Sequence, residues 1–190
     1  DWVQQIGGAH VHVVSLMTGY ESEHTYSPKP SDLVAIRQAS LLFEVGAGLE
    51  VWVSSLVKNA GNASLQVVTT SKEIDLIPDE PDSTADAHGH QHAGGNPHVW
   101  LDPAAAATMV RHIAKAMSEA DPPHAEEYRA KTAGYLQALM RVQEESWERL
   151  KKVPNRAVIV HHPAWPYFAR RYDLRIAGTI LTQPGGEPSA

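Results

Sequence analysis

The sequence predicts an α/β protein of two lobes, each built on a parallel sheet flanked by helices, with one long helix joining them. Short apolar segments alternate with helical segments along most of the 190 residues, which is the pattern of βα units with parallel strands. One helical segment, at about 123–152, is far longer than the others. The composition is that of a folded chain, since 43% of the residues are hydrophobic and 20% are charged.

The apolar periodicity of the first half predicts three strands with helices around them. In chain order these elements are a helix end at 1–6, a strand at 10–17, a helix capped by Ser31, a strand at 39–45, a helix at 49–58 and a strand at 65–70. The strands are short and apolar, so we expect them to be buried in a parallel sheet.

Two helices and two strands are expected in the second half. Asp102 followed by Pro103 is a typical N-cap and first helical position, and predicts a helix to about Ala120. The next helix, over 123–152, would span roughly 45 Å at 1.5 Å per residue, which suits a connection between lobes. Strands are expected at 156–160 and 174–180.

These elements divide the chain into three predicted parts. They are an N-terminal metal-binding lobe at 1–121, a linking helix at 122–152 and the start of a C-terminal lobe at 153–190. We expect the second lobe to be incomplete, because Ser189 would cap a helix that has no residues left to form it. A surface loop is expected at 79–95, where Asp, Gly, Ala and His replace apolar residues.

Composition limits the possible functions. The formal net charge is −6, which gives nucleic-acid binding no electrostatic support. No apolar run is long enough to span a bilayer, and the first residues do not form a signal peptide, so we expect a mature or trimmed chain. Cysteine is absent and histidine occurs 11 times, so a metal site here would use imidazole and carboxylate ligands.

Three histidines lie in connections between predicted elements. His24 follows the first predicted strand, His98 directly precedes a helix, and His162 follows a later strand. Ligands in open α/β sheets gather at the carboxyl edge of the strands, where such connections meet. Three neutral imidazoles suit zinc, so we predict a metal site that forms only on folding. Taken singly, each residue would also fit a solvated or hydrogen-bonded histidine.

A second group of histidines alternates within the predicted surface loop. The residues are His88, His90 and His92. This pattern favours weak metal collection by a flexible segment, while a chance cluster is the alternative.

The sequence around the three separate histidines resembles the zinc/manganese solute-binding proteins of bacterial ABC importers, also called cluster A-I or the periplasmic high-affinity zinc uptake family. The similar segments are His24-Thr25-Tyr26 with Pro30-Ser31-Asp32-Leu33, the stretch 96–103, the stretch 162–172 and Gly186-Glu187-Pro188-Ser189. The resemblance implies two α/β lobes, a rigid long helix, and a metal between the lobes held by His24, His98 and His162. It also implies that this chain lacks family segments at both ends. One of them, beyond Ala190, would carry a late carboxylate that serves as the fourth ligand. Glu23 or a water is the alternative fourth ligand.

The resemblance also implies a function. The expected cargo is Zn(II), with Mn(II) as the alternative, and the expected partner is an ABC permease in the cytoplasmic membrane. We expect a monomer with no enzymatic activity, located in the periplasm or lipid-anchored on the outer face of that membrane. A zinc-dependent hydrolase and a metal-binding surface adhesin are the other candidates, since three histidines with an open position also occur in catalytic zinc sites.

Overall fold

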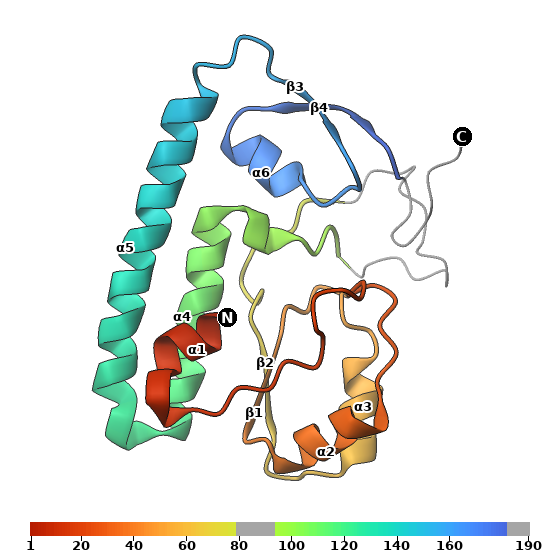
Figure 1. Ribbon diagram of the computed structural model, residues 1–190, viewed down its shortest axis with the longest axis vertical. Coiled ribbons are helices and arrows are strands. Elements are labelled where there is room, and N and C mark those ends of the chain that lie inside the picture. The colour runs from red at the N-terminus through yellow and green to blue at the C-terminus, as the bar shows by residue number, and fades with distance from the viewer. Residues whose placement is uncertain (79–93, 182–190) are drawn as a thin grey trace.

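Two small parallel sheets lie at opposite ends of the molecule, and one long helix runs along one side from the one end toward the other (Figure 1). The computed structural model describes residues 1–78 and 94–181. The first sheet pairs β1 (Leu41–Glu44) with β2 (Gln66–Thr69), and the second pairs β3 (Ala157–Val160) with β4 (Arg175–Thr179). Both pairs are parallel, and they confirm the predicted α/β class.

Helices cover the sheets and connect them. In the described part of the chain the α-helices are α1 (Trp2–Gly7), α2 (Pro30–Gln38), α3 (Val53–Ala60), α4 (Pro103–Ala120), α5 (Ala125–Leu150) and α6 (Pro166–Arg171). Single 3-10 turns precede or follow them at η1 (Gly8–His10), η2 (Val99–Leu101) and η3 (Pro122–His124). As the sequence predicts, α4 begins at Pro103 behind the N-cap Asp102, whose side chain accepts a hydrogen bond from the backbone of Ala104.

The alternating side chains of β1 separate two hydrophobic cores. Leu42 points toward α2 and α3 and packs on Ile36 and Leu56, whereas its neighbours Leu41 and Phe43 pack on the opposite side. That second core is formed by α1, α4 and α5, and its buried residues are Ile6, Val110, Ile113, Ala114, Met117 and Tyr128. Each large apolar side chain buried there stabilises the fold by roughly 1.5–3 kcal/mol.

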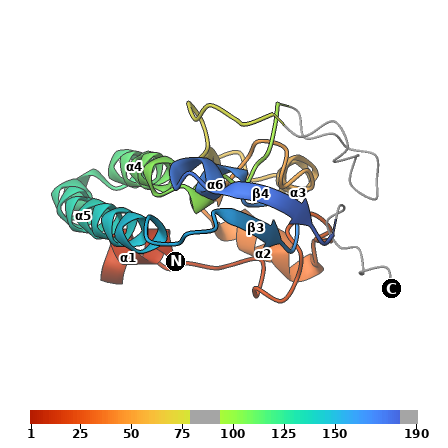
Figure 2. The same ribbon diagram turned by 90° about the horizontal axis from the view of Figure 1, so that it is seen from above.

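The long helix α5 has 26 residues and so spans about 39 Å. Its first half packs along α4, where Tyr128 and Thr132 are buried. Its second half extends beyond α4, and the side chains of Met140 and Trp147 there are 63% and 43% exposed. Seen from above, α4 and α5 stand side by side, and β3 and β4 lie away from them (Figure 2). The helix therefore links the two ends of the molecule, as its length predicts.

One predicted strand and one predicted cap are wrong. The segment 10–17 forms no strand, although it is largely apolar and its side chains alternate between exposed and partly buried positions over 10–14. The alternation shows which face packs on the protein, and it does not require a hydrogen-bonded neighbour. Helix α2 begins at Pro30 rather than after Ser31, because the carboxylate of Asp32 accepts a hydrogen bond from the backbone of Lys29, which is the N-cap two residues before the predicted one.

Some expectations concern residues outside the described part. The histidines of the predicted loop, His88, His90 and His92, lie outside it, as does the similar segment 186–189. The boundaries of the three predicted parts stay predictions. Among the helices that the structure describes, none has the length and apolar character needed to cross a membrane.

A polar cluster ties the start of the chain to the start of α5. The rings of His10 and His124 are stacked with centroids 3.8 Å apart. His124 Nδ1 lies 2.8 Å from Asp121 Oδ2, and the Tyr128 hydroxyl donates to the same oxygen at 2.5 Å. These contacts hold the pKa of Asp121 below its usual value, and the hydrogen bond from the Tyr128 hydroxyl is the largest cause.

The lowered pKa of Asp121 predicts a pH-dependent contribution to stability. A carboxyl whose folded pKa is depressed stabilises the fold above its ordinary pKa of about 3.9, and this contribution is lost as the pH falls through the folded value. Asp121→Asn should therefore lower the urea midpoint at neutral pH, with a gap to the parent that shrinks at acid pH. The exposed Asp75→Asn is the control. A gap of constant size down to about pH 3 would contradict this assignment.

Candidate metal centre

The structure brings the three predicted histidines together with a glutamate. One potential ligand atom from each of Glu23, His24, His98 and His162 lies within 4.8 Å of the others. His24 and His98 are 7% and 3% exposed, and the other two residues are partly exposed. Among the described residues this is the group with metal-ligand spacing.

The distances within the group suit a small tetrahedral cation. His24 Nε2 and His98 Nε2 are 3.2 Å apart, and the Glu23 carboxylate lies 3.9 Å from each of them. Two nitrogens bound at 2.0–2.1 Å to a tetrahedral zinc would be roughly 3.3 Å apart. The two nitrogens therefore already have the required separation, and the carboxylate needs only a small approach.

A tight turn presents Glu23 and His24 side by side. The backbone of Thr25 donates to the carbonyl of Ser22 at 3.2 Å, which makes the two candidate ligands the central residues of a four-residue turn. Adjacent residues in a turn can point toward one cation, whereas adjacent residues of a strand point to opposite faces. The segment 10–17 before this turn forms no strand. The turn is held instead by hydrogen bonds from Tyr26 and Lys29, which follow it, to Asp32 of α2.

The ring of His98 is held by Asn96. The side-chain oxygen of Asn96 accepts from the backbone of His98 at 3.1 Å and lies 2.9 Å from its Nδ1. An amide oxygen can only accept, so Nδ1 carries the proton and Nε2 presents its lone pair to the site. The amide nitrogen of Asn96 donates to the carbonyl of Pro163 at 2.7 Å, next to His162.

Gly95 allows this segment to approach its neighbour closely. Its backbone has a φ of +134°, which residues with a Cβ rarely adopt, and a Cβ at this position would lie 2.4 Å from the carbonyl oxygen of Ile77. That carbonyl accepts from the backbone of Asn96 at 2.8 Å. A glycine at position 95 is therefore required to place Asn96, and through it His98.

His162 enters the site from the end of β3. Burial lowers the pKa of its imidazole, Glu23 opposes this effect, and His161 adds slightly to it. The neighbouring His161 is exposed and lies outside the ligand group. The net effect favours a neutral imidazole at His162, which is the form that binds a metal.

Two further contacts hold the segment after β3 against the segment before α4. Tyr167, which is fully buried, donates to the carbonyl of Asn96 at 2.6 Å and accepts from the backbone of Ile77 at 2.9 Å. Arg171 makes two parallel bonds of 2.7 Å to the buried carboxylate of Asp102. A paired guanidinium and carboxylate of this kind is among the stronger polar contacts in proteins. The connections that carry His98 and His162 are therefore fixed to each other.

The aromatic residues near the three histidines have different surroundings. The Trp100 ring lies 5.2 Å from that of His98, and Tyr26 packs on Trp52 at 5.0 Å. Trp165 is 37% exposed and packs edge-on against Phe168.

No role was predicted for Asn96 from the sequence. An Asn directly before a proline is nevertheless a turn-forming signal, and it marks this position.

A family model described as zinc-uptake complex component A, periplasmic, matches residues 1–190. The chain belongs to this family. The predicted resemblance to zinc/manganese solute-binding proteins is thereby confirmed.

The curated relatives of this chain include two that are at least 30% identical to it. The manganese-binding lipoprotein MntA of Halalkalibacterium halodurans is 31% identical over 180 residues, covering 94% of this chain and 56% of its own length. A putative metal-binding protein of Treponema pallidum is 30% identical over 177 residues, covering 90% of this chain and 56% of its own length. The chain thus spans about half the length of the curated relatives it matches.

Solved structures have the same fold. A crystal structure of ZnuA superposes with a TM-score of 0.85 at 33% identity, covering 100% of this chain and 69% of the other. The metal-dependent lipoprotein YcdH of Bacillus subtilis superposes with a TM-score of 0.80 at 27% identity, covering 95% of this chain and 63% of its own. The two-lobe α/β architecture that the sequence predicts agrees with both.

Proposed function

We propose that this chain captures Zn(II) outside the cytoplasmic membrane and delivers it to an ABC permease, with His24, His98, His162 and Glu23 as the ligands. The observation that carries the proposal is the convergence of one carboxylate and three imidazoles from three separate segments. Membership of the zinc-uptake family supports the transport role. The permease, the location on the outer face of the membrane and the monomeric state belong to the same proposal.

The donor set favours zinc over manganese. Imidazole nitrogens suit zinc, whereas manganese prefers sites rich in carboxylate, carbonyl and water oxygens. Three of the four candidate donors here are nitrogens. Some curated relatives bear manganese in their names and others bear zinc, such as the zinc-binding lipoprotein AdcA of Streptococcus pneumoniae, so the donor set decides the proposal rather than the relatives' names.

The group is better suited to holding a cation than to turning over a substrate. A zinc hydrolase needs a general base beside an open metal position. Glu23 is the acidic member of the group, and in the proposal it completes the coordination shell. We therefore propose binding without catalysis.

Removal of one imidazole tests the ligand assignment. His98→Ala should weaken zinc binding by much more than about tenfold, because it removes one preoriented ligand from a set of four. Isothermal titration against a competing chelator measures the change. The matched control is His161→Ala, since His161 is exposed and adjacent to His162 but outside the ligand group. Equal zinc affinity in His98→Ala and the parent would refute the assignment, and so would an equal loss in both variants.

Protons should compete with zinc for the imidazoles. Zinc binds the neutral form, so affinity should fall as the pH drops, by roughly tenfold per pH unit for each imidazole that must lose a proton. The ordinary imidazole pKa is about 6.5, and burial lowers that of His162, so the fall due to this residue should begin below about pH 6.5. Chelator competition from about pH 7.5 to 5.5 gives the profile. A flat profile over this range would argue against imidazole ligands.

A further inference from the structure

The turn that carries Glu23 and His24 lies in a long segment without regular secondary structure. Between η1 and α2 the backbone forms no helix and no strand. Such a segment has many accessible conformations, and holding it in one of them costs conformational entropy. The contacts that fix it are therefore informative about how the ligands reach their positions.

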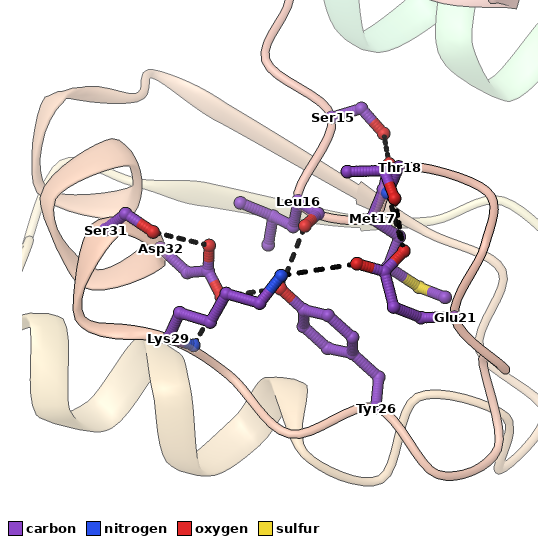
Figure 3. A network of polar contacts seen from close by, with 9 residues as sticks. All are labelled: Ser15, Leu16, Met17, Thr18, Glu21, Tyr26, Lys29, Ser31 and Asp32. Carbon is purple, nitrogen blue, oxygen red and sulfur yellow. Dashed lines mark hydrogen bonds and ion pairs between the residues drawn. The ribbon is translucent and has the colours of Figure 1, made fainter.

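A polar network holds both flanks of this turn (Figure 3). We name it the ligand-loop brace, and its four side chains are those of Glu21, Tyr26, Lys29 and Asp32. Two of them lie two residues away from the ligand pair, Glu21 before Glu23 and Tyr26 after His24.

The buried part of the brace joins the turn to α2. The Tyr26 hydroxyl lies 2.8 Å from the Asp32 carboxylate and 2.8 Å from the carbonyl of Leu16. Tyr26 and Asp32 are 7% and 6% exposed, so the hydrogen bond to the charged oxygen is shielded from water and is a strong one. Asp32 is held in turn by the backbone of Lys29 at 2.7 Å, at the start of α2, where the helix dipole favours a negative charge.

The outer part of the brace closes the other flank. Glu21 accepts from the backbone and the hydroxyl of Thr18, at 2.9 and 2.7 Å, and lies 3.2 Å from Lys29 Nζ. The ammonium group also sits over the Tyr26 ring, 5.7 Å from its centroid. The ion pair is exposed, so it contributes less than the buried bond between Tyr26 and Asp32.

We propose that the ligand-loop brace holds Glu23 and His24 in the metal-binding arrangement before the metal arrives. This inference rests on the proposed function, and it assigns the four side chains as positioning residues that do not touch the metal. Groups that orient ligands typically change metal affinity by roughly 10–100-fold when they are removed. Here the effect passes through the backbone of a four-residue turn, so we expect the lower end of that range.

Tyr26→Phe tests the brace with little disturbance of packing, because the ring keeps its contact with Trp52 and only the hydroxyl is lost. Zinc affinity should fall by about tenfold. In the metal-free variant the backbone amides of Glu23, His24 and Thr25 should exchange with deuterium faster than in the parent, and zinc should restore their protection. The exchange result separates positioning from direct ligation, because it is measured without metal.

The matched control is Tyr128→Phe, which removes a hydroxyl bound to the carboxylate of Asp121 far along the chain from the ligands. It should lower stability and leave zinc affinity within about twofold of the parent, since Tyr128 contacts none of the ligands. The brace is refuted if Tyr26→Phe binds zinc as the parent does, if the exchange at 23–25 is unchanged, or if Tyr128→Phe loses as much affinity. A parent that does not bind zinc refutes the proposed function itself.

Discussion

The side-chain amide of Asn96 joins the two halves of the candidate metal centre. Its oxygen fixes the ring of His98 and its nitrogen holds the carbonyl of Pro163, beside His162. The amide thus sets the orientation of one candidate ligand and the distance to another, which follows β3 and is distant in sequence. The tolerance for displacement is small, because nitrogens bound to one zinc must lie roughly 3.3 Å apart. Gly95 and Tyr167 support the constraint by placing the backbone of Asn96.

The two pairs of candidate ligands, His98 with His162 and Glu23 with His24, are held in place by different kinds of structure. His98 and His162 are placed by regular elements, since α4 starts just after one and β3 ends just before the other. Glu23 and His24 lie in a segment of turns, and polar contacts to α2 take the place of a sheet there. The candidate ligands are therefore positioned by two different means, regular elements for His98 and His162 and side-chain hydrogen bonds for the turn of Glu23 and His24.

The sequence predicts the elements whose signals are local. Asp102 followed by Pro103 places the start of α4, and the long periodic stretch places α5 within a few residues. The strand predicted at 10–17 is wrong, because an apolar run reports burial, whereas strand pairing depends on a neighbour that is distant in sequence. The meeting of His24, His98 and His162 is expected from their connections, but the roles of Asn96 and Asp32 depend on partners that no local pattern identifies.

The central claim is that one zinc ion is held by three imidazoles and one carboxylate. X-ray absorption at the zinc edge of the zinc-loaded protein measures this coordination most directly. The predicted result is a shell of four nitrogen and oxygen neighbours at about 2.0–2.1 Å, with outer-shell scattering from three imidazole rings. A shell of six oxygens, or scattering that accounts for one imidazole or none, would contradict the claim.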